Sequence, residues 1–502
     1  MSPYSGFKVL VANRGEIALR ILRTCRELGM PSVAVYSDAD EHSLHARYAD
    51  EAVRIGPADS AGSYLNISAV IDAAMKSGAR AVHPGYGFLS ENPEFAWAVE
   101  AAGMVFIGPR PETVALTGDK LAARRVAREA GLPVLPGPDE PLNDGPIDSQ
   151  LSSQVVFPVL IKAVAGGGGR GIRLANAAEE LEMMIEAARK EALAAFGNDA
   201  VYFEPMVQGA RHIEVQVIGD GEGRILCLGE RECSIQRRRQ KLIEEAPAPR
   251  LPETLRKAFQ AHAVRLAEQL RYRSLGTVEF LLDQNGTMFF IEVNPRIQVE
   301  HPVTEMVIGI DLVREQLLLA ASGKLHLTEL DMYPRGAAIE ARVLAEDASL
   351  GFLPATGEIA HLLLPAGPGI RVDTGLYLGM PVSADYDSLL AKVIVWDESR
   401  NRAVARMKRA LEEFQIGGVP TDLDFLHQIV SSRSFRTGRT DTTYLDHFSP
   451  AENPTGDTME TDLAAAVALL ASQEMVRNEP SPKKVESMDS WKYAAWRGQM
   501  RG

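Results

Sequence analysis

The chain has only three cysteines among its 502 residues, Cys25, Cys227 and Cys233. They cannot all pair and do not have metal-ligand spacing, so a disulfide framework is excluded and a reducing compartment is expected. Long apolar runs are also missing. No stretch approaches the roughly 20 apolar residues of a membrane span, and the N-terminus lacks the apolar core of a signal peptide. These absences favour a cytoplasmic protein with no membrane partner.

Positive charge is scarce, since the formal net charge is −14. This argues against a general nucleic-acid or membrane-surface binder, both of which need clustered cations. The basic run "QRRRQK" ends at Lys241 and has no interleaved aromatics. Binding of an anionic substrate by Gln236 and Lys241, or ion pairing at the surface, is therefore preferred. The length predicts several domains, and the 46% hydrophobic content is that of an ordinary globular protein.

The first 110 residues have the pattern of a Rossmann-like α/β domain. Residues 7–12 predict a buried strand, 17–28 a helix and 32–36 a second strand. The first turn, "ANRGE", has one glycine where dinucleotide-binding folds have three, which excludes a nicotinamide site. A second glycine-rich loop follows in "AVHPGYGFLSEN".

The middle of the chain mixes helices and strands. A helix is predicted from Thr117 to about Ala130, ended by Gly131 and Pro133. Residues 155–175 predict strand, glycine loop and strand, followed by a helix over 177–196 and a strand over 200–207. Strands dominate 212–230 and 277–293, and "PRG" at 334–336 is a predicted boundary. Short strands and an amphipathic helix at 402–414 come next, before a polar segment from 449 with one candidate helix at 462–475.

A hairpin is predicted in "TVEFLLDQNGTMFFIEVN". Asn-Gly between two apolar runs is the strongest short-range hairpin signal. If residues 285–286 form a two-residue turn, Phe280 faces Ile291 and Glu279 faces Glu292. Opposed residues have Cβ atoms about 5 Å apart, and like charges so placed destabilise a sheet. A positive group is therefore expected between the two glutamates.

Asn294 extends this acidic pair on the same face of the strand. Two carboxylates and an amide oxygen suit Mg²⁺ or Mn²⁺. An exposed sheet face with both glutamates in water is the alternative. Further on, Arg296 and Glu300 would stand about 13 Å apart in a flat strand. The segment therefore has to curl if both are to reach one small ligand.

The glycine-rich stretch "KAVAGGGGRGIR" follows an apolar strand, as phosphate-binding loops do. No Gly-Lys-Ser/Thr follows, so it is not a Walker loop, and a loop between two strands suits a flap over phosphates. A flexible linker is the alternative. Lys162 ends the first strand and points toward this loop. Lys120 lies in the first turn of its predicted helix, where a bound phosphate would offset the helix dipole; a solvated lysine is the other reading.

Several long motifs, in order, closely resemble biotin carboxylase, a member of the ATP-grasp superfamily. They are "ANRGEIALRILR", "HPGYGFLSEN", "GGGGRG", "RHIEVQV", "QRRRQK" and "EVNPRIQVEHPVTE", and the resemblance covers about residues 6–447. It implies an N-terminal α/β domain (1–116), an ATP-grasp domain (117–335) with a mobile lid at about 134–206, and a C-terminal biotin carboxylase domain (336–448). Residues 449–502 form a tail, expected to be partly disordered.

The resemblance also implies the reaction. The family uses ATP and Mg²⁺ or Mn²⁺ to activate bicarbonate as carboxyphosphate and then carboxylates biotin. The implied catalytic residues are Lys241, Arg296, Glu300 as the base, and Arg342, which matches an arginine that stabilises the biotin enolate but which could equally pair with Glu340. Bicarbonate would be bound by Lys241, Arg296, Gln298, Val299 and Glu300, and the metals by Glu279, Glu292 and Asn294. ATP would be bound by Lys120, Lys162, Gly167, Gly168, Gly169, Glu204, Val207, His212, Gln236, Glu279 and Glu292.

The sequence departs from the family pattern in a few places. Arg239 stands where many members have histidine, Pro205 replaces a common lysine, and the glycine loop begins with Ala165. The two Met-Lys pairs, at 75–76 and 407–408, lie in amphipathic helical stretches and are not credible biotinylation sites. Biotin is therefore expected on a separate carrier protein, with separate carboxyltransferase subunits and a homodimer as further family expectations.

Two alternatives share part of this pattern. Another ATP-grasp carboxylate–amine ligase would have the nucleotide and metal residues without the set from Arg296 to Glu300. A non-catalytic nucleotide-binding regulatory subunit would lack Lys241, Arg296 or Glu300, all of which are present. The final carboxyl acceptor, whether acetyl-CoA, propionyl-CoA or pyruvate, is not encoded in these motifs.

Overall fold

The computed structural model describes residues 3–142, 155–165, 172–328 and 332–449. All of them belong to one compact unit, Met1–Ser449. The glycines predicted to bind ATP (Gly167, Gly168 and Gly169), the predicted tail and its candidate helix lie outside the described residues. Within the described ranges, no helix is long and apolar enough to cross a membrane.

The N-terminal part is a five-stranded sheet in which every neighbouring pair is parallel, in the order β3-β2-β1-β4-β5. Its core has two layers, because alternate residues of β1 face opposite sides. Val9 and Val11 pack with Ile17 of helix α1, whereas Leu10 packs with Phe95 of helix α4. The predicted α/β domain is thereby confirmed. Its strands are Val9–Val11 (β1), Ser32–Ser37 (β2), Glu51–Gly56 (β3), Ala81–His83 (β4) and Val105–Phe106 (β5), and its helices include Gly15–Leu28 (α1), Leu44–Tyr48 (α2), Ile67–Ser77 (α3) and Pro93–Ala101 (α4).

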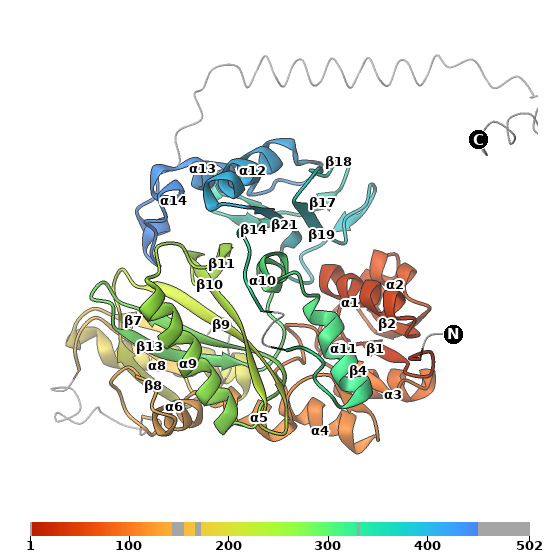
Figure 1. Ribbon diagram of the computed structural model, residues 1–502, viewed down its shortest axis with the longest axis horizontal. Helices are drawn as coiled ribbons and strands as arrows, with labels where there is room; N and C mark the ends of the chain where they lie inside the picture. The colour runs from red at the N-terminus through yellow and green to blue at the C-terminus, as the bar shows by residue number, and fades with distance from the viewer. Residues whose placement is uncertain (1–2, 143–154, 166–171, 329–331, 450–502) are drawn as a thin grey trace, which may run out of the picture. The chain divides into compact units, whose positions relative to one another are not determined.

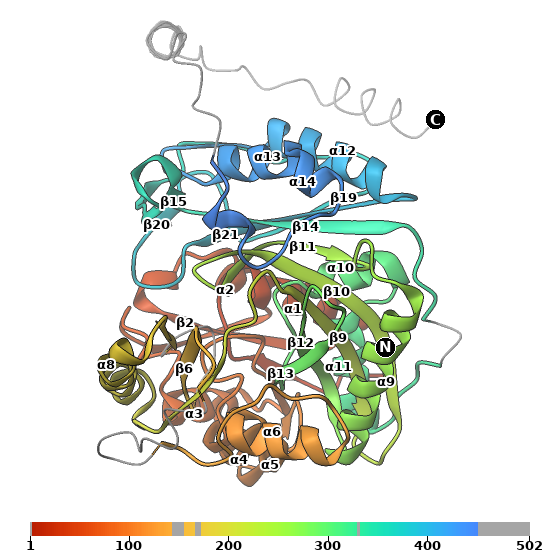
Figure 2. The ribbon, with the colours of Figure 1, turned by 90° about the vertical axis from the view of Figure 1, so that its left-hand side faces the viewer.

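An antiparallel sheet of eight strands forms the centre of the unit, in the order β13-β12-β9-β10-β11-β14-β21-β19. It runs without a break past the predicted boundary at 334–336, because β11 pairs with β14 (Figure 2). Its strands are Arg211–Asp220 (β9), Ile225–Arg237 (β10), Gln240–Ala246 (β11), Arg273–Leu282 (β12), Met288–Asn294 (β13), Ala337–Leu344 (β14), Ile370–Thr374 (β19) and Leu389–Asp397 (β21).

Helices cover this sheet in two groups (Figure 1). Glu253–Gln269 (α9) packs on β9 and β10, with Phe259 and Phe280 in edge-to-face contact. Arg400–Glu413 (α12) packs on β14 and β21 and starts two residues before the predicted helix. The remaining helices of this part are His301–Ile308 (α10), Leu312–Ser322 (α11), Leu423–Ser431 (α13) and Arg433–Arg436 (α14).

A third, smaller sheet contains Ile172–Ala175 (β7), Val159–Ala163 (β6) and Val201–Pro205 (β8), in that order. Helix α8 (Ala178–Phe196) packs on it, so the predicted strands and the helix of this part are confirmed, whereas most of the glycine loop between the first two strands lies outside the described residues. The helix predicted from Thr117 is wrong at its start. Two helices are present, Pro111–Gly118 (α5) and Lys120–Glu129 (α6), because the Asp119 carboxylate accepts a hydrogen bond from the Ala122 N–H and starts a new helix at Lys120.

The hairpin between β12 and β13 confirms part of the predicted register and corrects the rest. Glu279 does face Glu292, but Phe280 pairs with Phe290, because Ile291 is an extra residue that forms a β-bulge. The loop is also longer than two residues. Asp283 and Thr287 close it by a backbone hydrogen bond of 2.9 Å, and the Asp283 carboxylate accepts from the N–H groups of the loop.

The bulge decides which side chains share a face. Phe290 packs against Phe280 in the core, while Glu292 joins Glu279 on the opposite face. Residues 290 and 292 are two apart, so in an unbroken strand they would point the same way. The bulge therefore allows an apolar strand to end in an acidic site.

Candidate active site

Lys241 is the centre of a buried group of charges that four separate segments bring together. Its Nζ lies 2.5 Å from Glu214 on β9, 2.8 Å from Glu279 on β12 and 2.7 Å from Glu300, which directly precedes α10. The lysine side chain is 12% exposed, and those of Glu214 and Glu300 are fully buried. Burial lowers the pKa of Lys241, but the three carboxylates raise it well above its ordinary value. The ammonium therefore stays charged.

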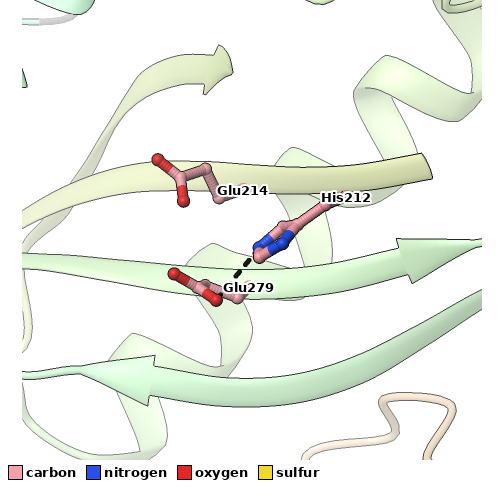
Figure 3. A group of neighbouring side chains, drawn as sticks. All are labelled: His212, Glu214 and Glu279. Carbon is pink, nitrogen blue, oxygen red and sulfur yellow. Dashed lines mark ion pairs between the residues drawn. The ribbon is translucent and has the colours of Figure 1, made fainter. Parts of the chain in front are cut away.

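Strand β9 supplies this site through the alternation of its side chains. In "RHIEVQV", His212, Glu214 and Gln216 are buried on one face, while Ile213 and Val215 join the apolar core on the other. The fully buried Arg231 of β10 binds Glu214 and donates to Gln216 at 2.8 Å. Figure 3 shows His212, Glu214 and Glu279 converging. Their ligand atoms lie within 4.8 Å of one another, but the Lys241 ammonium already binds both carboxylates.

Glu300 lies between two cations. Its Oε1 accepts from Lys241, and its Oε2 accepts from the guanidinium of Arg342 on β14 at 2.9 Å. Burial alone would raise the pKa of Glu300, but Lys241, Arg342 and Arg231 lower it well below its usual value. Glu300 is therefore an ionised carboxylate that its neighbours hold in place.

Arg342 bridges Glu300 and Glu244. Its Nε donates to Glu244 Oε1 at 2.6 Å, and its other ion pair is the one to Glu300. Among the described residues, no ion pair joins Arg342 to Glu340, so the alternative pairing is not the one adopted. Burial lowers the pKa of Arg342, but Glu244 and Glu300 raise it by more, so the net pKa lies above the ordinary value. The guanidinium therefore stays charged.

The segment after β13 is not extended. This agrees with the expectation that the chain must curl if Arg296 and Glu300 are to reach one small ligand. Strand β13 ends at Asn294, and α10 begins at His301. Within this bend the Arg296 guanidinium donates to Gln298 Oε1 at 2.7 Å, and Gln298 in turn donates to Glu279 at 3.1 Å. Arg296, Gln298 and Glu300 thus border the same cluster around Lys241.

The candidate metal residues Glu279, Glu292 and Asn294 are brought together. Glu279 accepts from the Asn294 amide at 2.9 Å, and its Oε2 lies 3.0 Å from His212 Nε2. Burial raises the pKa of Glu279, but Lys241 and His212 lower it below its usual value. The pKa of Glu292 is raised, first by burial and then by the facing Glu279.

These residues fit a divalent cation. Glu279 has its ammonium partner, whereas the pKa of Glu292 stays raised despite the attraction of Lys120 and Lys162. Oxygen ligands from two carboxylates suit Mg²⁺ or Mn²⁺. Glu279 is 5% exposed, so the alternative of two solvated glutamates is wrong. Asn294 Oδ1 accepts from Arg296 at 3.2 Å, and its oxygen would have to exchange that partner for the ion.

Two of the residues predicted to bind ATP, Lys120 and Lys162, come from α6 and β6. Lys120 begins α6, and its backbone N–H donates to Val164, next to the strand that carries Lys162. Burial lowers the pKa of Lys120. Glu292 raises it and Lys162 lowers it again, and the net pKa is below the ordinary value. A phosphate group would offset these neighbouring positive charges.

Three further predicted ATP residues have defined surroundings. Glu204 on β8 binds Lys162 and the buried Arg124, the latter at 3.1 Å. The Gln236 side chain on β10 is hydrogen-bonded to His212 Nδ1 at 2.7 Å. Val207 follows β8 and is partly exposed.

Sequence reasoning missed several members of the site. Glu91 accepts from Arg296 Nε at 2.6 Å, Glu214 binds Lys241, and Glu244 binds Arg342. Glu91 lies in "HPGYGFLSEN" and Glu214 in "RHIEVQV", so both belong to the motifs that carry the resemblance. For Glu214 the alternation of polar and apolar residues was a usable signal.

Three family models match successive parts of the chain. Residues 6–114 match the biotin carboxylase N-terminal domain, residues 119–328 the ATP-binding domain of the carbamoyl-phosphate synthase L chain, and residues 340–447 the biotin carboxylase C-terminal domain. The chain is 48% identical to a biotin carboxylase of Nostoc sp. over 442 residues, covering 88% of this chain and 99% of that protein. It is 47% identical to a biotin carboxylase of Pseudomonas aeruginosa over 440 residues, covering 88% and 98%.

A solved structure agrees with these matches. The biotin carboxylase domain dimer of Hydrogenobacter thermophilus 2-oxoglutarate carboxylase, in complex with MgADP, ADP and bicarbonate, superimposes with a TM-score of 0.85 and is 45% identical. The alignment covers 88% of this chain and 97% of that one.

Proposed function

The chain belongs to the biotin carboxylase family, and we propose that the cluster around Lys241 is where it carboxylates biotin with ATP and bicarbonate. One observation carries the assignment of roles: Glu300 is held by Lys241 at 2.7 Å and by Arg342 at 2.9 Å. A bicarbonate anion would be attracted to the same cations. Bound there, bicarbonate would place its proton beside Glu300. Among the described residues, Glu300 is the only carboxylate that binds both Lys241 and Arg342.

Glu300 acts as the general base. While both cations hold it, its low pKa makes it a weak proton acceptor, and catalysis needs a pKa closer to neutral. Bicarbonate that binds Lys241 and Arg296 would share their charge and bring its own negative charge near Glu300. Both effects raise the pKa of Glu300 when the substrate is present, so the base becomes effective only then.

Each neighbouring group has a role that fits its chemistry. The planar guanidinium of Arg296, with Gln298 and the backbone of Val299, binds the planar anion. Lys120 and Lys162 bind the ATP phosphates, and Glu204, Val207, His212 and Gln236 complete the nucleotide site. When bound at Glu279, Glu292 and Asn294, Mg²⁺ or Mn²⁺ supplies charge neutralisation for the phosphates. Arg342 stabilises the negative charge that develops on biotin.

The reaction proceeds in two steps. Bicarbonate loses its proton to Glu300 and attacks the γ-phosphorus of ATP, which gives ADP and carboxyphosphate. The bond between the carboxyl carbon and the phosphate oxygen of carboxyphosphate then breaks, and the departing phosphate accepts the proton of the ureido nitrogen of biotin, which forms the new bond to the carboxyl carbon. The family resemblance supports an ATP-grasp domain of residues 117–335 with a lid at about 134–206; Gly167, Gly168 and Gly169, proposed to bind ATP, lie outside the described residues.

The wider setting is proposed from the family resemblance. Biotin would be carried by a separate carrier protein and the product used by separate carboxyltransferase subunits, as the first half-reaction of acetyl-CoA carboxylase or a related acyl-CoA or pyruvate carboxylase. The structural neighbour is a dimer, so a homodimer is proposed here too. The three free thiols suit a cytoplasmic location. Co-purification with a biotinylated chain would identify the carrier.

A single assay tests this function. The purified chain is incubated with MgATP, bicarbonate and free biotin, and ADP release is measured with each component omitted in turn. We expect release that depends on both bicarbonate and biotin. ADP release that biotin does not stimulate would exclude the proposal and favour another ATP-grasp ligase.

A further inference from the structure

A fully buried lysine on β21 joins the three segments that the family models match. Lys392 Nζ donates to the carbonyl oxygen of Val299 at 2.9 Å and lies 3.1 Å from Glu16 Oε1. Glu16 belongs to the segment 6–114, Val299 to 119–328 and Lys392 to 340–447. The lysine side chain has no exposed area. A buried ammonium is costly unless it is paired, so its geometry is tightly constrained.

The carbonyl that Lys392 binds belongs to the peptide group joining Val299 to Glu300. Fixing that peptide fixes the direction in which the Cα of Glu300 presents its side chain. Glu300 is also the residue before α10, whose Val303 N–H donates to the Glu300 carbonyl at 3.3 Å. Helix α10 packs on β14 and β21, the strands that carry Arg342 and Lys392 (Figure 1).

Glu16 is the counter-ion that Lys392 does not share with another cation. Asp373 is farther away, at 3.9 Å, and is bound by both ends of the Arg371 guanidinium. Glu16 accepts in addition from the Tyr86 hydroxyl. Burial lowers the pKa of Lys392, but Glu16, Glu340 and Asp373 raise it above its ordinary value, so the ammonium keeps its charge.

We propose that Lys392 is a positioning residue for the general base, which it orients by holding the Val299–Glu300 peptide while Glu16 balances its charge. This inference rests on the proposed function, because it takes Glu300 as the base. Lys392 touches neither substrate nor nucleotide in this scheme. It acts through the backbone on the angle at which Glu300 meets bicarbonate.

The test removes the ammonium together with its counter-ion. In the double variant E16Q/K392M, Asp373 retains Arg371, and the buried Glu340 loses the attraction of Lys392 but keeps that of Arg342. We expect kcat for bicarbonate- and biotin-dependent ADP release to fall by about 10- to 100-fold, the effect of a small misplacement of a catalytic group. The KM for MgATP should stay within about two-fold of wild type, because the nucleotide residues are untouched.

Two further variants separate positioning from folding. E16Q alone keeps the bond from Lys392 to Val299 and should lose much less activity than the double variant. The control variant E245Q/R400M removes another ion pair with little exposure, in which Arg400 of α12 lies 2.6 Å from Glu245 of β11. It should keep wild-type kcat. E16Q/K392Q is made in parallel, so that the comparison survives if the methionine variant does not fold.

The outcomes distinguish this inference from the proposed function. A wild-type chain without biotin-dependent ADP release contradicts the function itself. An active wild type with an equally active E16Q/K392M contradicts only the inference. The inference is also overturned if E16Q alone causes the full loss of kcat. The same holds if the double variant lowers the thermal unfolding midpoint and changes kcat and the KM for MgATP together.

Discussion

The ammonium of Lys241 lies 2.7 Å from the Oε1 atom of Glu300, and the same ammonium binds Glu214 and Glu279. One lysine thus balances three carboxylates that come from three separate segments. Removing one partner of such a buried network leaves charges without compensation.

The substitution K241M should therefore affect stability as well as activity. We expect the free energy of unfolding to fall by about 3–5 kcal/mol and ADP release to be lost. Thermal unfolding of K241M is measured beside that of the control variant K76M. The Lys76 side chain is 76% exposed, so its loss should change stability by no more than about 0.5 kcal/mol. Equal midpoints for K241M and K76M would show that Lys241 does not stabilise the cluster.

Arg342 offers a test of how the charge on Glu300 is controlled. The substitution R342M removes one of the two cations that bind Glu300, so the pKa of Glu300 should rise. The acidic limb of the pH–rate profile should move to higher pH, and kcat with biotin should fall by about 100-fold. An unchanged acidic limb would mean that Glu300 is not the group titrating there.

Asp422 gives a pH-dependent prediction about stability. This side chain is 1% exposed and directly precedes α13; its Oδ1 accepts from the Leu344 N–H at 2.8 Å, and burial raises its pKa from 3.8 to about 8. Because the folded chain binds this proton more tightly than the unfolded chain, the stabilising effect is complete below about pH 4 and is lost as the pH rises to about 8.

The matched variant is D422N, which keeps the acceptor for Leu344 and cannot ionise. Relative to wild type, its free energy of unfolding should increase by about 1.4 kcal/mol per pH unit within that window. Chemical denaturation of both proteins at several pH values measures the difference. Glu346 raises the pKa of Asp422 and its partner Arg237 lowers it, and both groups are the same in the two proteins. A constant difference would contradict the raised pKa.

Gly276 on β12 predicts a steric effect. A Cβ at this position would lie against the phenol ring of Tyr272, which is fully buried and donates to Leu275 O at 3.2 Å. G276A should therefore destabilise the chain by about 1–3 kcal/mol. Gly6, where no atom lies within 4 Å of an added Cβ, provides the control G6A. Equal thermal unfolding midpoints for G276A and G6A would contradict the predicted steric clash.

The hairpin of β12 and β13 shows what local sequence predicts well and what it does not. The Asn-Gly signal identified the hairpin and the pair of Glu279 and Glu292. It also predicted a two-residue turn, whereas the Asp283 side chain organises a longer loop, and the bulge at Ile291 compensates for the change in register. Period-two patterns do not reveal a bulge, because the extra residue is itself apolar and half-buried.

The candidate site divides in the same way. The residues of "EVNPRIQVEH" and Lys241 were predicted and are brought together, because each lies in a strongly patterned motif. Glu91 and Glu244 were missed, since their partners Arg296 and Arg342 are distant in sequence and only the folded chain brings them together. The continuation of the central sheet from β11 into β14 was missed for the same reason.

The most direct test of the account is the substitution E300Q, which removes the proton acceptor and keeps the size of the side chain. Carboxybiotin formed from labelled bicarbonate and the dissociation constant for MgATP are measured on the same preparations of wild type and E300Q. We expect carboxybiotin formation to fall by about 100-fold or more while MgATP binding stays within about two-fold of wild type. Carboxybiotin formed by E300Q at the wild-type rate, or a parallel loss of MgATP binding, would contradict Glu300 as the base.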